Sequence, residues 1–163
     1  MARRAKLGFH MEVNYHNRRR KPEVEQQLGV KYCSLEQLLQ ESDFILVLTP
    51  LTPETKDLID YAQFALMKKT AIFINVSRGG TVNEQALIEA LQTKRIYGAG
   101  LDVYMQEPVD ANNPLLQLDN VVTLPHIGSA TEQTRFDMAM LAATNLVEAL
   151  SGKIPKSIVP ELR

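Results

Sequence analysis

Apolar and polar residues alternate along this chain in two rhythms. Continuous apolar runs, such as residues 44–49 and 71–76, are rich in β-branched residues and are typical of parallel strands buried on both faces. Strands of this kind are predicted at residues 44–49, 71–76, 99–103 and 121–124, and shorter extended segments at 11–15 and 30–33. Segments with helical periodicity lie at residues 22–28, 34–40, 61–67, 83–92 and 130–150. Strands that alternate with helices in this way predict an α/β fold with a partial doubly wound parallel sheet.

Residue types at the segment ends support the predicted helices. Pro22 stands at a first helical position, and Gly29 follows the last residue of the same segment. Ser34 with Gln37 three residues later predicts a capping box, in which each side chain bonds the other residue's backbone N–H. In segment 83–92 the apolar residues recur one helical turn apart, which predicts a helix with one buried face.

Composition narrows the classes of function. The chain has 163 residues with 18 Lys+Arg against 19 Asp+Glu, so it lacks the basic excess of a nucleic-acid binder. Cys33 is its one cysteine, which excludes an internal disulfide, argues against a metal site and favours a reduced, cytoplasmic setting. No apolar run approaches the ~20 residues needed to cross a bilayer, so we expect no membrane span.

Ligands of parallel sheets bind beyond the carboxyl ends of the strands, so the residues after each predicted strand are the candidates for a site. A basic cluster at residues 16–21, which contains Asn17, Arg18 and Arg19, follows the first strand. At this place in a dinucleotide-binding fold, an acid binds the ribose 2′-hydroxyl of NAD, whereas arginine accommodates the 2′-phosphate of NADP. No acid occurs in the cluster before Glu23. The cluster therefore predicts either an NADP site or a solvated basic loop.

Residues suited to acid–base chemistry follow three later strands. Arg78 precedes two glycines, Glu107 precedes a proline, and His126 lies between a proline and Ile127. A guanidinium binds a carboxylate through two parallel hydrogen bonds, an imidazole moves a proton near neutral pH, and a neighbouring carboxylate stabilises the imidazolium. Because parallel strand ends meet at one edge, we expect the three side chains to converge. Taken singly, Arg78 also fits a surface residue in a glycine turn, and His126 fits a structural imidazole.

Three separated motifs carry a family resemblance. They are INVSRGG at residues 74–80, GAGLDVYMQEP at 98–108 and LPHIGSAT at 124–131. In residues, order and spacing they resemble the D-isomer-specific 2-hydroxyacid dehydrogenases, and most of all the bacterial glyoxylate/hydroxypyruvate reductases, including those that reduce 2-ketogluconate. The resemblance implies a Rossmann-like cofactor domain. It also implies reduction of a small 2-oxo acid (glyoxylate, hydroxypyruvate or 2-ketogluconate) to the D-2-hydroxy acid.

The same resemblance implies roles for individual residues. Arg78 would bind the substrate's carboxylate and carbonyl, His126 would donate the proton, and Glu107 would orient His126. The implied cofactor is a nicotinamide dinucleotide, with NADP(H) preferred and NAD(H) possible. The residues implied to bind it are Asn17, Arg18, Arg19, Thr49, Val76, Asp102 and Gly128. We further expect a homodimer.

One feature of the family is absent from this sequence. No glycine-rich G-x-G-x-x-G turn is present, and residues 1–8 look like the tail of the helix that follows such a turn. We therefore expect residues 1–150 to form an incomplete dinucleotide-binding domain that includes a long C-terminal helix. Residues 151–163 would be a tail that returns to an absent substrate domain. The strand missing from the sheet would lie between the strands at 11–15 and 44–49, and we expect the chain alone to be inactive or impaired.

Two other functions fit the sequence. The chain could be a non-catalytic dinucleotide-binding module with an interaction or regulatory role, as in the corepressors of the same family. It could also be a packing fragment without activity of its own. The presence of Arg78, Glu107 and His126 together favours the enzyme, and substitution of His126 distinguishes the enzyme from the module.

Overall fold

The computed structural model describes residues 1–159. Each strand overlaps one of the predicted strand segments and is shorter than that segment. The strands are β1 (Asn14–Tyr15), β2 (Lys31–Tyr32), β3 (Phe44–Val47), β4 (Ile72–Asn75), β5 (Gly98–Leu101) and β6 (Val121–Thr123). The helices are α1 (Ala2–Phe9), α2 (Pro22–Leu28), α3 (Leu35–Glu41), α4 (Tyr61–Leu66), α5 (Glu84–Gln92) and α6 (Glu132–Leu150), with 3-10 turns η1 (Gly79–Thr81) and η2 (Pro114–Gln117).

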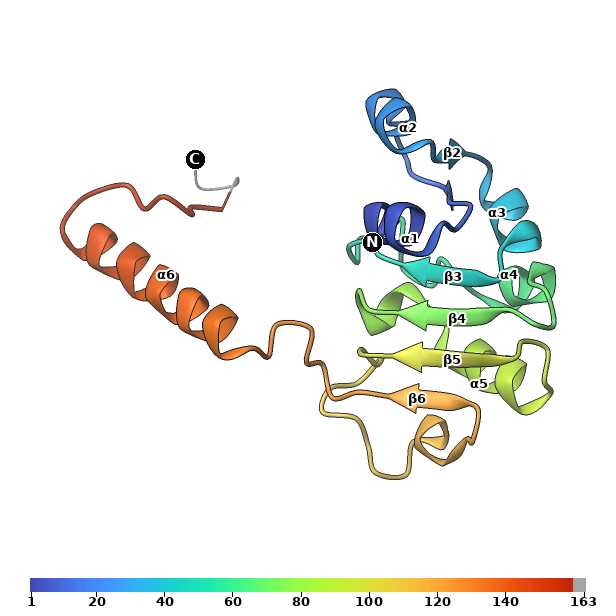
Figure 1. Cartoon of the computed structure of the whole chain (residues 1–163). Coiled ribbons are helices and arrows are strands. Elements are labelled where there is room, and N and C mark those ends of the chain that lie inside the picture. The colour runs from blue at the N-terminus through green and yellow to red at the C-terminus, as the bar shows by residue number, and fades with distance from the viewer. Residues whose placement is uncertain (160–163) are drawn as a thin grey trace. The chain divides into compact units, whose positions relative to one another are not determined.

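The predicted parallel sheet is present in two parts. Strands β3, β4, β5 and β6 are hydrogen-bonded in that order, all in parallel. Strand β1 pairs in parallel with β2 in a separate two-stranded sheet. The register sets Val47, Asn75, Leu101 and Thr123 side by side, and Figure 1 shows the arrowheads of β3 to β6 pointing to one edge. The segments that follow these strands therefore begin at a common edge.

The apolar core joins this four-stranded sheet to the helices that connect its strands. The predicted apolar face of α5 is buried, with Ala86 and Leu91 each 1% exposed. Phe64 of α4 meets Phe73 of β4 edge to face, with ring centroids 5.3 Å apart. Both phenyl rings are buried, so they fix α4 against the sheet. This packing makes the sheet a rigid base for the loops at its carboxyl edge.

The structure confirms some predicted helix ends and corrects one. Helix α2 begins at Pro22 and is followed by Gly29 in the left-handed conformation, at φ 64°. At α3, Ser34 Oγ accepts from the backbone N–H of Gln37, but the Gln37 side chain donates to Glu41 Oε1 at 2.9 Å instead of to Ser34. The predicted capping box is therefore half formed, because a carboxylate one turn along the helix competes for the amide.

The prediction that the 44–49 strand is buried on both faces is also wrong. Phe44 is 47% exposed and Leu48 is 55% exposed, while Ile45 and Val47 are buried. Phe44 is the first residue of β3 and Leu48 directly follows its last, so the exposed residues stand at the two ends of a strand that is itself the first in the four-stranded order within residues 1–159. Its neighbour β4 alternates buried and half-buried residues. A continuous apolar sequence thus does not guarantee two covered faces.

The chain divides into two compact units, one of residues 1–126 and one that begins at residue 127. The second unit contains α6, which begins after Thr131, whose Oγ1 accepts from the backbone N–H of Thr134. No residue of α6 is buried. The predicted functional division at residue 150 stays a prediction, and residues 160–163 of the predicted tail lie outside the described residues. Within residues 1–159 no helix is long and apolar enough to cross a membrane.

Candidate active site

A carboxylate and an imidazole meet at the carboxyl edge of the sheet. Glu107 lies in the loop after β5, and His126 follows β6. His126 Nδ1 is 2.7 Å from Glu107 Oε2, and the other carboxylate oxygen accepts from the backbone N–H of Tyr104 at 3.0 Å. The two side chains are 45% and 37% exposed, so a solute can reach the pair. This geometry holds the ring by Nδ1 and directs the opposite nitrogen, Nε2, away from Glu107.

The surroundings of the Glu107–His126 pair lower the pKa of Glu107. The hydrogen bond from His126 is the main cause that lowers the pKa of Glu107, and partial burial opposes it. The Tyr104 N–H and the positive charge of Arg78 lower that pKa further. Glu107 is therefore ionised at neutral pH, as a group must be to stabilise an imidazolium.

His126 adopts an uncommon backbone conformation. Its φ is 55°, in the left-handed region that residues with a Cβ atom rarely occupy. Two residues earlier, the carbonyl of Leu124 accepts a hydrogen bond from the Tyr104 hydroxyl at 3.1 Å. The loop that carries the imidazole is thus attached to the loop that carries the carboxylate at a second point.

Arg78 lies at the start of η1, directly after β4. Its backbone carbonyl accepts from Asn75 Nδ2 at 3.1 Å and from Thr81 Oγ1 at 2.7 Å, and both of these side chains are buried. One guanidinium nitrogen, Nη1, donates to the carbonyl of Ser77 at 2.6 Å. The buried network fixes the Arg78 backbone, while the side chain is exposed and near enough to Glu107 to affect its pKa.

Gly79 brings the Arg78 segment against the Glu107 loop. A Cβ atom at Gly79 would lie 1.9 Å from the carbonyl oxygen of Tyr104, which is far inside van der Waals contact. Only glycine fits this approach. Arg78, Glu107 and His126 thus come from three strand ends to one region, as their sequence positions predict.

The residues predicted to line a cofactor are also near the strand ends. Thr49 follows β3, and its Oγ1 is buried without a hydrogen-bond partner within the described chain. Val76 follows β4 and is 44% exposed, and Leu124 after β6 is 43% exposed. Asp102, directly after β5, is buried. An unpaired hydroxyl beside exposed apolar side chains fits a flat ligand that brings a polar group, such as a nicotinamide dinucleotide.

The basic cluster after β1 contains one arginine that is bound by a carboxylate and two that are exposed. Arg20 donates through Nε and Nη2 to the two carboxylate oxygens of Glu25, at 2.8 and 2.7 Å. Arg18 and Arg19 are exposed, and Asn17 Oδ1 accepts from the backbone N–H of Arg18 at 3.1 Å. Gly128 lies in the second unit, and its predicted role in cofactor binding stays a prediction.

Sequence reasoning missed two residues that support the site. Tyr104 is buried and bonds both loops of the Glu107–His126 pair. Glu84, in the first turn of α5, accepts from the Met105 N–H at 3.0 Å and from Asn113 Nδ2 at 2.9 Å. An acid in a first helical turn was the available signal for Glu84, but it equally indicates a favourable helix-dipole contact.

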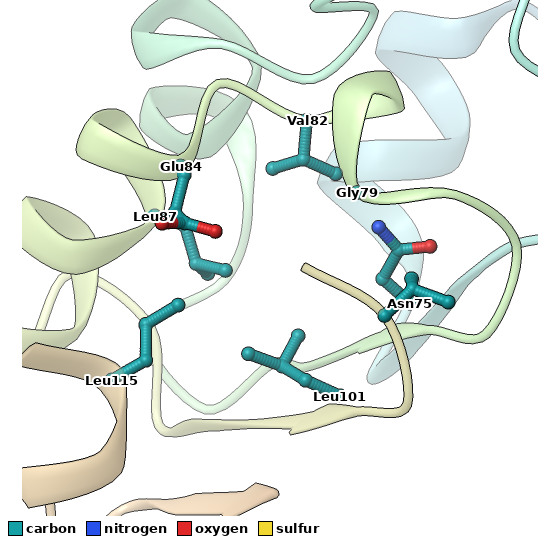
Figure 2. A pocket seen from close by; sticks show the side chains of 8 residues that line it. Asn75, Gly79, Val82, Glu84, Leu87, Leu101 and Leu115 are labelled. Atoms are coloured by element: carbon teal, nitrogen blue, oxygen red, sulfur yellow. The ribbon is translucent and has the colours of Figure 1, made fainter. Parts of the chain in front are cut away.

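Figure 2 shows Glu84 on the wall of a small cavity beneath these loops. The cavity measures about 10 Å³ and is lined by Asn75, Gly79, Val82, Glu84, Leu87, Leu101, Val103 and Leu115. Such a volume holds about one water molecule. The cavity is thus too small for an organic ligand, and it lies among residues that support the loops after β4 and β5.

Comparison with known proteins decides the family. Residues 1–128 match the NAD-binding domain of the D-isomer-specific 2-hydroxyacid dehydrogenases. The chain belongs to this family. The fold of residues 1–128 is thus that of a nicotinamide dinucleotide-binding domain, in agreement with the sheet and with the motifs quoted above.

The chain has close relatives among curated proteins of this family. It is 54% identical over 159 residues to glyoxylate/hydroxypyruvate reductase B of Salmonella newport, which covers 98% of this chain and 49% of that protein. The chain thus spans about half the length of the curated relatives it matches.

Solved structures of similar fold also match the chain over nearly its whole length. One is the TT0316 protein from Thermus thermophilus, with TM-score 0.85, 44% identity, and coverage of 93% of this chain and 47% of that one. Another is the NADPH-dependent glyoxylate/hydroxypyruvate reductase from Sinorhizobium meliloti in complex with NADP and malonate. Its TM-score is 0.86 at 34% identity, covering 97% of this chain and 48% of that one.

Proposed function

We propose that the protein to which these residues belong reduces a small 2-oxo acid to the D-2-hydroxy acid with a nicotinamide dinucleotide. Glyoxylate, hydroxypyruvate and 2-ketogluconate are the candidate substrates. The observation that carries the proposal is the 2.7 Å contact between Glu107 and His126 at the sheet edge that also presents Arg78. Similarity to the Salmonella and Sinorhizobium reductases supports it.

Each of the three residues has a distinct task in this reaction. The Arg78 guanidinium binds the carboxylate of the substrate and keeps its carbonyl near His126. With Nδ1 held by Glu107, Nε2 donates the proton to the carbonyl oxygen. Glu107, whose pKa is lowered, stabilises the protonated ring before the transfer. A bound nicotinamide supplies the hydride.

The residues that would hold the cofactor lie mostly at the same carboxyl edge of the sheet. Thr49, Val76 and Asp102 lie at the ends of β3, β4 and β5, and Gly128 completes the set by resemblance. Asn17, Arg18 and Arg19 would bind a ribose 2′-phosphate, which gives the preference for NADP(H) over NAD(H). Arg20 does not take part, because Glu25 already occupies its guanidinium fork. A cytoplasmic location and a homodimer stay predictions.

The decisive experiment joins this chain to the part of the Salmonella reductase that the chain does not span. We expect NADPH oxidation in the presence of glyoxylate or hydroxypyruvate, with kcat of order 1–10³ per second. His126→Ala should lower kcat by about 10²- to 10⁴-fold, the range typical of a lost acid–base group, while the KM for NADPH changes little. Unchanged turnover in His126→Ala would refute the proposed chemistry and favour a non-catalytic module.

Cofactor preference has a separate test on the chain itself. We expect 2′,5′-ADP to bind more tightly than 5′-ADP, because the added phosphate meets the exposed Arg18 and Arg19. The double variant Arg18→Ala/Arg19→Ala should lose most of that difference, measured by calorimetry. The matched control, Arg3→Ala/Arg4→Ala, removes two exposed arginines of α1 and should retain it. Equal affinity for the two nucleotides in the parent chain would contradict the NADP preference.

A further inference from the structure

Tyr104 contacts both halves of the Glu107–His126 pair. Its backbone N–H donates to Glu107 Oε1 at 3.0 Å. Its hydroxyl donates to the carbonyl of Leu124, two residues before His126, at 3.1 Å. Burial raises the pKa of Tyr104, so the hydroxyl stays protonated and able to donate. One buried side chain therefore attaches the loop after β5 to the loop after β6.

Glu84 holds the same loop from the opposite side. Its Oε2 accepts from the N–H of Met105, the residue directly after Tyr104. Its Oε1 accepts from Asn113, which itself caps η2 by accepting from the Leu115 N–H at 2.9 Å. Glu84 thus joins three segments: the start of α5, the Tyr104–Glu107 loop and η2. Glu84 binds the peptide N–H of Met105, and this holds the adjoining backbone of Tyr104, whose N–H donates to Glu107.

The Glu107–His126 contact needs this support on physical grounds. Its two side chains are 45% and 37% exposed, and pairs of that exposure stabilise their own geometry only weakly. His126 also has φ 55°, a conformation that persists only where the surrounding structure holds it. Functional side chains must stay within about 0.5 Å of their working position, which requires a second layer of contacts.

We propose that Tyr104 and Glu84 are positioning residues that hold His126 against Glu107. Neither touches the reacting atoms in this assignment. Tyr104 fixes the distance between the loop after β5 and the loop after β6. Glu84 fixes the position of the loop that carries Glu107. The assignment rests on the proposed function for its catalytic meaning, but the geometry that it explains can be measured without turnover.

The first test replaces only the hydroxyl of Tyr104. Tyr104→Phe removes the bond to Leu124 and keeps the ring in the core, and the control Tyr97→Phe removes an exposed hydroxyl. NMR titration of the labelled chain follows the Glu107 carboxylate and the His126 Nδ1 proton. We expect the pKa of Glu107 to rise toward its ordinary value in Tyr104→Phe, and the Nδ1 proton resonance to move upfield. Both signals should stay unchanged in Tyr97→Phe.

The second test removes the charge of Glu84. Glu84→Gln retains one acceptor oxygen, whereas Met105 N–H and Asn113 Nδ2 both need one. The control, Glu89→Gln, changes an exposed residue of the same helix. We expect the two NMR signals to shift in Glu84→Gln as in Tyr104→Phe, while Glu89→Gln leaves them in place. Backbone spectra that match the parent chain exclude unfolding as the cause.

Activity of the joined protein supplies the last measurement. Tyr104→Phe should lower kcat about tenfold with little change in the KM for NADPH, because misplaced acid–base groups slow the chemical step. Unshifted Glu107 and His126 signals in both variants would overturn the positioning roles, whatever the turnover. If instead the parent protein does not turn over while both signals shift, the positioning roles hold and the proposed reaction fails.

Discussion

Single residues decide how closely the loops of the site approach one another. Gly79 is the clearest case, because a Cβ atom there would overlap the carbonyl of Tyr104. The same contact sets Arg78 near Glu107, since Arg78 is the neighbour of Gly79. A glycine in this place therefore serves the geometry of the charged groups as well as the packing of η1.

Replacement of Gly79 should destabilise the chain. In Gly79→Ala the methyl group must push the Tyr104 loop away, and overpacking of this kind costs about 1–3 kcal/mol. The control, Gly8→Ala, adds a methyl group in α1 where nothing lies within 4 Å, and should stabilise the chain by about 0.5 kcal/mol. Urea unfolding measures both. Equal stability of Gly79→Ala and the parent would show that the loop yields freely.

The sequence predicted some of the residues that meet at this edge of the sheet and missed others, and the difference has a physical reason. The proximity of Arg78, Glu107 and His126 could be predicted because each follows a strand, and the topology of parallel sheets brings such positions together. Tyr104 could not be found in the same way, because its role depends on a hydroxyl that reaches the carbonyl of Leu124, twenty residues along the chain. The left-handed backbone of His126 has no local signal either, since its neighbours are Pro125 and Ile127.

At the scale of elements, the β1–α2 segment has its own electrostatic clamp. Glu25 of α2 accepts from the Tyr15 hydroxyl at 2.7 Å and from both donors of the Arg20 fork. Chiefly because of the bond from Arg20, the pKa of Glu25 falls to about 2. Arg20 also lies over the Tyr32 ring of β2, 5.9 Å from its centroid. The clamp therefore links α2 to both strands of the small sheet.

This clamp predicts a pH dependence of stability. The carboxyl of Glu25 has a pKa of about 2 in the folded chain and about 4.3 when unfolded. Its stabilising effect is thus complete above pH ~4.3 and lost as the pH falls toward 2. The urea midpoint of Glu25→Gln should lie below that of the parent by a constant amount from pH 7 to 5. The difference should shrink between pH 4 and 2.

The control for the clamp is Glu23→Gln, an exposed acid in the same helix. It should leave the midpoint nearly unchanged at every pH, since Glu23 lies outside the Arg20 fork. A Glu25→Gln difference that does not depend on pH would contradict the electrostatic origin of the clamp.

Helix ends were predicted best where a single residue type acts directly on the backbone. Pro22 and Gly29 bound α2 because proline and glycine act on the backbone itself. The capping box at Ser34 failed because Glu41, one turn further, takes the Gln37 amide. A complete box forms instead at Asp60 and Gln63 of α4, where the short segment gave little helical periodicity to draw attention to it.

At the scale of the whole molecule, stability should be uneven between the two sheets. The main core cluster draws on β3, β4, β5 and helices α3 to α5, whereas β1 and β2 are two residues long and lie outside that cluster. We expect amide protons of β4 and β5 to exchange most slowly in native-state hydrogen exchange, and those of β1 and β2 to exchange much faster. Similar protection in the two sheets would contradict this division.

The sequence predicted the class of sheet but only part of its extent. Apolar runs mark the four strands of the larger sheet, yet they do not report how fully each face is covered, so the exposure of Phe44 on β3 was not predicted. Pairing between distant strands depends on the complete set of neighbours in three dimensions. That information lies in no single run of residues.

The left-handed backbone at His126 has a consequence for the choice of residue at this position. Glycine would adopt φ 55° without the cost of about 1 kcal/mol that a side chain incurs there. Folding stability alone would thus favour glycine at position 126. The proton-donor role proposed for His126 would account for an imidazole in a conformation that folding alone does not favour.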